Sequence, residues 1–130
     1  MEKEKLSSKL LNFVFVMCGG LLGSLSRYAI SLVVPKNICA VSLVNILGSF
    51  LVIWFNNKLM PKKKRLKLFA ITGYLGSFTT FSYFSLETMQ FLNSGQYATF
   101  AFNIILNMLG SLTSAFVGWK LFTDSENLFF

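Results

Sequence analysis

The residues best suited to binding an ion lie together inside an apolar stretch of the chain. Residues 73–84 read Gly-Tyr-Leu-Gly-Ser-Phe-Thr-Thr-Phe-Ser-Tyr-Phe, which combines two glycines with a cluster of hydroxyl and aromatic side chains. This composition predicts a break in a membrane helix, and such backbone is tolerated at membrane depth only beside protein or a water-filled path. Broken helices are also where transport proteins coordinate ions. We therefore expect freed carbonyls near Gly73–Thr80 to be able to hold a cation. Hydroxyl groups are added by Thr79, Thr80 and Ser82.

Three other side chains suit an anion. Phe81 and Phe84 are three residues apart and share one helical face. Such pairs usually pack in a core or against lipid, but the positive edge of an aromatic ring can also contact an anion. Asn45 lies in the middle of an apolar segment, and its amide group supplies two donors. An interhelical hydrogen bond and a pore-lining donor to an anion are both open readings for it.

Further polar residues lie in the last apolar segment and near the ends of the first and third apolar segments. Asn103, Asn107 and Ser111 are spaced at i, i+4 and i+8, which predicts a polar stripe facing a pore or a partner subunit, with simple helix packing as the alternative. Arg27 lies late in the first apolar segment, where it is either an interfacial anchor or part of a vestibule. Glu87 follows Phe84 by about one turn and is expected at a vestibule rim.

The elements that position these residues are membrane helices. Of the 130 residues 54% are hydrophobic, and a soluble domain of this length would need more polar surface. A span needs about 20 apolar residues, and four such segments use nearly the whole chain. We predict a single four-span, all-α membrane domain over residues 1–130, with the third helix broken. The predicted spans are 10–34, 38–56, 66–91 and 97–122.

Charge and residue types exclude two other classes of function. The net charge is +7, but the basic run Lys62–Arg65 lies in one loop between spans, as in a cytoplasmic loop, and does not form a nucleic-acid-binding face. The chain has no histidine and no nucleophile–base pair, so we do not expect an enzyme.

In the first span Gly19 and Gly23 are four residues apart, which predicts that another helix approaches closely there.

Three sequence elements together resemble the small bacterial fluoride channels of the Fluc or CrcB family. Gly19–Tyr28 is similar to the family's GGxxGxxxRY element, and Asn45–Phe50 is similar to its NxxGSF element. Gly73–Phe84 resembles the family's GxxGxxTTFSxF element, which is the most specific of the three. The order and spacing of the elements agree over essentially the full chain.

The resemblance implies an antiparallel dimer with two narrow fluoride pathways in a bacterial cell membrane. It implies that the chain is a passive channel that exports fluoride and so lowers its cytoplasmic concentration. A structural sodium ion at the dimer interface would be held by the backbone carbonyls of Gly76 and Thr79, and we expect Gly76 to be needed because the break requires a residue without Cβ. The expected fluoride pathway comprises Asn45, Thr80, Phe81, Ser82, Phe84, Asn107 and Ser111.

Departures from the family pattern and the charge distribution suggest a particular partner. Val41, Tyr83 and Asn103 stand where the family usually has other residues. Four spans place both termini and the second loop on one side, and ten of the twelve Lys and Arg residues fall on that side. This bias predicts that both termini are cytoplasmic. A chain so biased is poorly suited to inserting both ways, so we expect a heterodimer with a homologous subunit of opposite orientation.

Two alternative functions remain at this stage. One is a small four-span multidrug-type transporter, although the carboxylate expected in its first span for proton coupling is missing from residues 10–34. The other is a non-transporting membrane assembly subunit, in which the polar stripe would only hold helices together.

Overall fold

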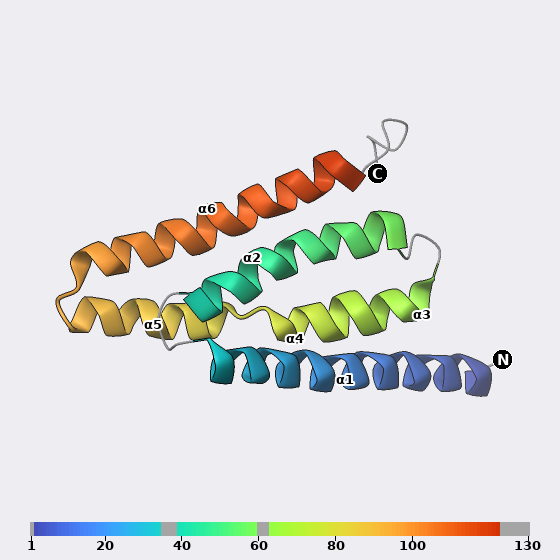
Figure 1. Ribbon diagram of the computed structural model, residues 1–130. Helices are drawn as coiled ribbons and strands as arrows, with labels where there is room; N and C mark the ends of the chain where they lie inside the picture. Colours follow the sequence, from blue (N-terminus) through green and yellow to red (C-terminus); the bar gives the residue numbers. More distant parts are fainter. Residues whose placement is uncertain (1, 35–38, 60–62, 123–130) are drawn as a thin grey trace.

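Helices make up nearly all of the described chain. The computed structural model describes residues 2–34, 39–59 and 63–122, and within them there is no strand. The helices form four segments, of which the third is divided into several elements (Figure 1). The predicted all-α class, with a break in the third segment, is confirmed. The elements are α1 (Glu2–Val33), α2 (Cys39–Trp54), η1 (Phe55–Leu59), α3 (Lys64–Lys67), η2 (Leu68–Leu75), α4 (Gly76–Phe78), α5 (Phe81–Asn93) and α6 (Tyr97–Phe122).

Three helical stretches are long and apolar enough to cross a membrane, namely Leu6–Val33, Ala40–Lys58 and Tyr97–Phe122. The bounds of α6 agree with the predicted span 97–122, whereas α1 begins at Glu2, well before the predicted start at residue 10. Glu and Lys are good helix formers, so the polar N-terminal residues continue the helix. The predicted loop 35–37 lies outside the described residues.

The third segment differs from an ordinary span in its helical repeat as well as in its break. Residues Leu68–Leu75 form a π-helix, in which each N–H bonds to the carbonyl five residues earlier, and η1 is a second π-helical stretch. The α-helical repeat resumes at Gly76, and two residues later the helix ends. Segment three therefore reaches the break by a path that a regular α-helix would not follow.

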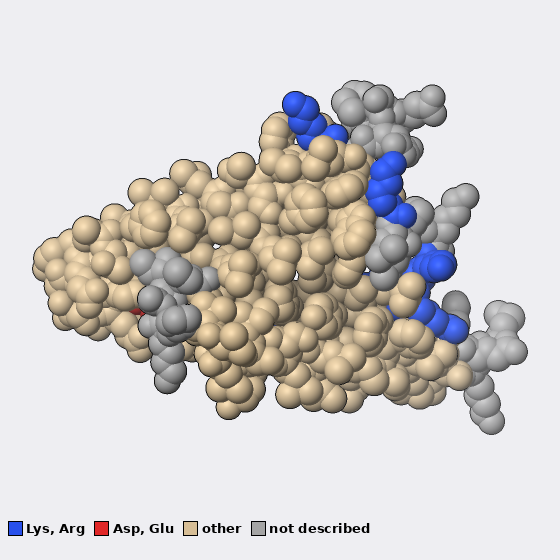
Figure 2. All heavy atoms as spheres, in the orientation of Figure 1, with Lys and Arg blue, Asp and Glu red and all other residues tan. Residues whose placement is uncertain are grey.

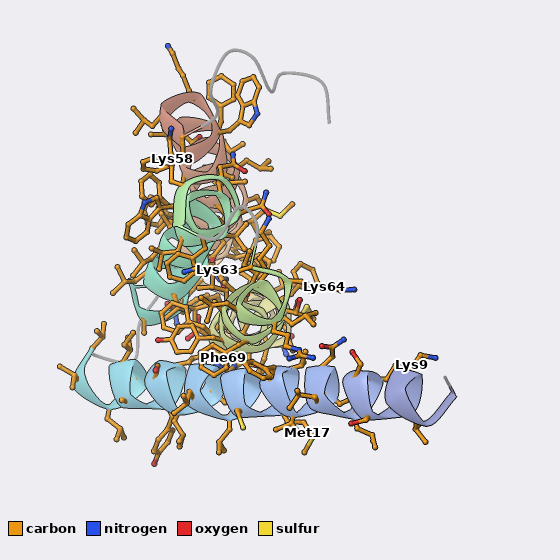
Figure 3. All side chains as sticks on the ribbon, turned by 90° about the vertical axis from the view of Figure 1, so that its right-hand side faces the viewer. Lys9, Met17, Lys58, Lys63, Lys64 and Phe69 are labelled. Carbon is orange, nitrogen blue, oxygen red and sulfur yellow. The ribbon has the colours of Figure 1, made fainter. Side chains whose placement is uncertain are left out.

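Close backbone contacts join α1 to the third segment. A Cβ added at Gly19 would overlap the carbonyl oxygen of Phe69, and one added at Gly23 would overlap that of Tyr74. Figure 3 shows Phe69 at the junction of η2 with α1, while Met17 points away from the bundle. The Tyr74 hydroxyl also donates a hydrogen bond to the Ser26 Oγ at 3.0 Å. The predicted close approach at the small-residue face of the first span is confirmed.

The helices stack as a layered bundle, in which α6 packs on α2 and α5, and α1 packs on η2 and α4 (Figure 1). The apolar core is small and centres on Val44, Leu75 and Phe78. Most large apolar side chains instead face outward, as Phe13, Leu25 and Phe116 do. An apolar exterior of this kind is suited to lipid rather than to water.

Basic side chains gather at one end of the bundle. The N-terminal end of α1, the elements η1 and α3 and the C-terminal end of α6 all lie at this end (Figure 1). Lys and Arg side chains cluster there (Figure 2), and Figure 3 looks onto the cluster with Lys9, Lys58, Lys63 and Lys64 labelled. The fold therefore brings Lys9 of α1 to the same end as Lys58, Lys63 and Lys64.

Candidate functional site

The break in the third segment consists of two threonines in extended backbone. Thr79 has φ −75° and ψ 156°, and Thr80 has φ −150° and ψ 115°. The Thr80 Oγ1 caps the following helix by accepting a hydrogen bond from the Tyr83 N–H at 3.2 Å. The Thr79 N–H and Oγ1 both donate to the Leu75 carbonyl, which closes the preceding helix. The break is thus built by side chains that end one helix and start the next.

The predicted role of the glycines in this break was wrong in part. We expected unwinding from Gly73 onward, but the chain stays helical through Phe78. Gly76 has helical dihedrals of φ −61° and ψ −29°, and a Cβ added there would meet only the Ile71 carbonyl oxygen, at an ordinary 3.7 Å. The break within the subunit does not therefore require a residue without Cβ at position 76. Gly73 is the constrained glycine, because its Cβ would lie 2.5 Å from the Val16 carbonyl oxygen.

Asn45 of α2 holds the peptide groups of Thr80 from both sides. Its Oδ1 accepts from the Thr80 N–H at 2.8 Å, and its Nδ2 donates to the Thr80 carbonyl at 3.2 Å. The Asn45 Nδ2 also donates to the Asn107 Oδ1 at 3.0 Å. Both amide donors of Asn45 are therefore engaged, and an anion that binds here must replace one of these two acceptors.

These hydrogen bonds free the two carbonyls that were predicted to hold a cation. In a continuous helix the Thr80 N–H would donate to the Gly76 carbonyl, and the Tyr83 N–H would donate to the Thr79 carbonyl. Both donors are diverted, to the Asn45 Oδ1 and the Thr80 Oγ1. The carbonyls of Gly76 and Thr79 thus lose their usual helical partners, and oxygens of this kind are suitable ligands for a hard cation.

Six of the seven predicted pathway residues line one cavity of about 390 Å³ beside the break. Ser82 is not one of its lining residues and is exposed. Four lining residues were not predicted as pathway residues. Thr79 was predicted as a cation ligand, and the others are Ser49, Met108 and Leu112. Ser49 lies four residues after Asn45, and this helical spacing was the signal that could have found it. Met108 and Leu112 directly follow Asn107 and Ser111 in the sequence, and their spacing gave no such signal. The predicted residues on the cavity wall are Asn45, Thr80, Phe81, Phe84, Asn107 and Ser111.

The two phenylalanines of the cavity differ in exposure. Their ring centroids are 5.6 Å apart and the planes are tilted by 57°. Phe84 is 7% exposed, whereas Phe81 is 74% exposed in the single subunit. One ring is therefore held by the subunit itself, and the other lies on a face that nothing in the described part of the subunit covers.

A second cavity, of about 480 Å³, contains the two predicted vestibule residues. Arg27 of α1 and Glu87 of α5 both line it, together with Tyr83 and Thr80. The Glu87 Oε2 is buried and has no hydrogen-bond partner among the described residues. Thr80 lines both cavities, so the break lies between them.

The polar stripe of the last helix faces the interior of the subunit. Asn103 is 0% exposed and Asn107 is 4% exposed. Asn107 lines the cavity beside the break, whereas Asn103 lies behind it and donates to the Thr88 Oγ1 at 2.9 Å. The stripe borders a cavity and also joins helices, as the packing alternative expected, and its role facing a pore or a partner subunit stays a prediction.

Comparison with known proteins assigns the family. Residues 14–119 match the family described as CrcB-like protein, Camphor Resistance. The chain belongs to the CrcB family. The fluoride-specific ion channel FluC of Ruminiclostridium cellulolyticum is 42% identical over 121 residues, which cover 87% of this chain and 93% of that protein. The protein of the same name from Campylobacter jejuni is 42% identical over 124 residues, with 87% and 99% covered, and that of Methanococcus aeolicus is 33% identical over 105 residues, with 77% and 85% covered.

The second and third of the three sequence elements meet at the helix break, and the first packs against the helix that precedes it. The first element supplies Gly19 and Gly23, which bring α1 against η2. The second supplies Asn45, which holds Thr80, and Gly48, where an added Cβ would overlap the Thr79 methyl group. The third element contains the break itself. The resemblance seen in the sequence therefore corresponds to one spatial unit.

Proposed function

We propose that this chain is a fluoride-selective, passive ion channel, and not an enzyme, that exports fluoride from the cytoplasm. Membership of the CrcB family and the names of the relatives, which are fluoride-specific ion channels, support the choice of ion. The observation that carries the proposal is the cavity at the break, where the Asn45 amide and the rings of Phe81 and Phe84 border one space. A selective path must replace the water around an ion by groups of the protein. Amide N–H groups and the positive edges of aromatic rings are suited to do so for a small anion.

The driving force needs no further machinery. Hydrogen fluoride crosses membranes as a neutral acid and ionises inside the cell, and the interior-negative potential then drives the anion outward. At a potential of about 100 mV this is worth roughly 2.3 kcal/mol for one charge, or about fiftyfold in concentration. The first alternative function, a multidrug-type transporter, would need a proton-coupling carboxylate in its first span, and residues 10–34 contain none. The second, a non-transporting assembly subunit, is made less favourable by the names of the relatives.

We further propose that four spans of one domain, residues 1–130, assemble as an antiparallel dimer in a bacterial cell membrane. Phe81 is 74% exposed on the single subunit, and Gly76 is exposed, with only the Ile71 carbonyl oxygen near an added Cβ. A partner covering this face would complete the pathway. Approximate two-fold symmetry between homologous subunits would bring the carbonyls of Gly76 and Thr79 next to the matching carbonyls of the partner, where they would hold a structural sodium ion. Once bound, that ion would supply a positive charge near the anion path.

The charge distribution supports a heterodimer with both termini of this chain in the cytoplasm. The basic cluster lies at the end of the bundle that contains the N-terminal end of α1 and the C-terminal end of α6 (Figure 2). Because cytoplasmic ends carry the positive excess, this chain would insert in one orientation. A homologous subunit with the opposite bias would then supply the inverted half.

Fluoride efflux from liposomes tests the proposal. The chain is reconstituted alone and together with an oppositely biased homologue, and fluoride release is compared with chloride release and with protein-free liposomes. We expect fluoride release without chloride release in at least one of the two preparations. Absence of fluoride release from both would overturn the channel assignment. Proton-coupled movement of an organic cation would favour the transporter alternative.

A further inference from the structure

A chain of side-chain hydrogen bonds leads from the helix break into α6 and back to α5. Asn45 Nδ2 donates to Asn107 Oδ1 at 3.0 Å, and Asn107 Nδ2 donates to Asn103 Oδ1 at 2.9 Å. Asn103 Nδ2 then donates to Thr88 Oγ1 at 2.9 Å, and Thr88 donates to the Phe84 carbonyl at 2.7 Å. We call these four linked side chains, three amides and one hydroxyl, the amide chain. Its members are Asn45, Asn107, Asn103 and Thr88.

The break sets the direction of the amide chain. The Thr80 peptide presents an N–H and a carbonyl to Asn45, so the amide oxygen and nitrogen of Asn45 can be arranged in only one way. The Asn45 Nδ2 must then meet an acceptor on Asn107, and the Asn107 Nδ2 must meet an acceptor on Asn103. Each amide is thus oriented by the one before it, and reversing any one of them would bring two donors or two acceptors together.

Burial makes the links of the amide chain depend on one another. Asn103 is 0% exposed, Asn107 is 4% exposed and Thr88 is 8% exposed. Hydrogen bonds in such surroundings are stronger than in water, and an amide that donates well becomes a better acceptor at its oxygen. Asn107 Nδ2 donates to two side-chain acceptors, Asn103 Oδ1 and Ser42 Oγ, both at 2.9 Å, and to the Asn103 backbone carbonyl at a longer 3.1 Å. The side chains of Asn103 and Ser42 therefore share most of the task of holding the Asn107 amide.

We propose that Asn103 is a positioning residue for the anion pathway, acting together with Ser42 through Asn107. Asn103 does not line the cavity beside the break and acts on Asn45 only through Asn107. With Asn107 held, its oxygen fixes one Asn45 N–H beside the cavity, where an anion can replace that oxygen as the acceptor. Thr80 holds the other side of the Asn45 amide, so loss of this support does not reverse the amide. It removes the Asn107 oxygen from its place and lets the Asn45 N–H shift away from the anion path. The inference rests on the proposed function, because it gives Asn103 a part in fluoride passage.

The test combines flux with a signal from the Asn45 amide itself. Asn103→Leu and Ser42→Ala are made singly and together, in the assembly that gives flux for the unaltered chain. Because the two residues share one task, we expect each single variant to lower fluoride flux about threefold and the double variant to lower it more than about tenfold. The matched control is Thr113→Val with Ser114→Ala on the same helix. Its Ser114 donates to the Ile46 carbonyl of α2 and lies outside the amide chain, and we expect flux within about twofold of the unaltered chain.

The second measurement follows the side-chain N–H₂ resonances of Asn45 in chain labelled with ¹⁵N-asparagine, identified by their loss in Asn45→Asp. We expect the double variant to move these resonances and the control variant to leave them in place. Thr88→Val tests the far end of the amide chain without the larger change at Asn103, and it too should move the Asn45 signal.

Three outcomes separate the possibilities. Unmoved Asn45 resonances in the double variant would overturn the inference even if flux fell, since the loss would then come from packing. Flux within about twofold of the unaltered chain in the double variant would overturn it as well. Absence of fluoride flux in the unaltered chain would instead overturn the proposed function, and the resonances would still decide whether the amide chain orients Asn45.

Discussion

Alanine substitutions at two glycines of the third segment should have opposite effects on the subunit. At Gly73 an added Cβ would lie 2.5 Å from the Val16 carbonyl oxygen and 3.0 Å from the Gly19 Cα, and both are backbone atoms of α1 that cannot rotate away. Overpacking of this kind costs about 1–3 kcal/mol. Replacing Gly by Ala in a helix returns about 1 kcal/mol. We therefore expect Gly73→Ala to lower the free energy of unfolding by up to roughly 2 kcal/mol.

Gly76→Ala is the matched comparison in the same segment. Its Cβ would meet nothing closer than the Ile71 carbonyl oxygen at 3.7 Å, so only the gain in helix propensity remains. We expect the subunit to be as stable as the unaltered chain or about 1 kcal/mol more stable. Because Gly76 lies on the face proposed to meet the partner, we also expect a smaller dimer fraction.

The assay is unfolding in mixed detergent micelles of increasing SDS content, followed by tryptophan fluorescence of Trp54 and Trp119, with dimer content measured by cross-linking at low SDS. If Gly73→Ala were as stable as Gly76→Ala and neither lost stability relative to the unaltered chain, the argument that backbone contact between α1 and η2 limits position 73 would be refuted. A loss at Gly76→Ala as large as at Gly73→Ala would restore the original expectation that the break itself needs a glycine there.

Three further predictions concern the anion path, the cation and the orientation. Phe81→Ile should lower fluoride flux with little change in subunit stability, because Phe81 is 74% exposed. Phe84→Ile should lower both the flux and the stability, because Phe84 is 7% exposed. Unchanged flux in both variants would return the rings to a packing role. Replacing sodium by a large organic cation during purification should reduce dimer content and flux together, and an unchanged dimer would argue against Gly76 and Thr79 as cation ligands. Labelling of both termini in intact cells should find them only in the cytoplasm, and full fluoride resistance from this chain alone with termini on both sides would contradict the heterodimer.

Much of the fold followed from the sequence because apolar length and spacing are local properties. The last helix could be bounded at Tyr97–Phe122, and the spacing of Gly19 and Gly23 predicted a close helix contact. The element Gly73–Phe84 located the break to within a few residues. These features depend on neighbours along the chain, which a sequence displays directly.

The details of the site could not be read in the same way because they depend on partners far apart in the chain. Thr79 and Thr80 form the break, rather than the glycines, since Asn45 from 35 residues earlier takes the Thr80 N–H. The roles of Asn103 and Asn107 likewise depend on Thr88 and Asn45, which belong to other helices. Spacing predicted that the two asparagines share a face, but it could not identify the groups opposite them.

The π-helical stretch Leu68–Leu75 makes the length of the third segment as informative as its residues. In a π-helix the bonding partner is five residues away rather than four, so the stretch holds more residues per turn than an α-helix. Deleting one residue from it would let the stretch return to the α-helical repeat, in which fewer residues complete the same turn. The residues that follow would then be turned much less than the roughly 100° that a deletion from an α-helix causes, and Thr80 would stay on the side of Asn45. Single-residue deletions between residues 68 and 75 should therefore be less damaging than a single-residue deletion in α6, and a deletion scan can separate chain length from side-chain identity.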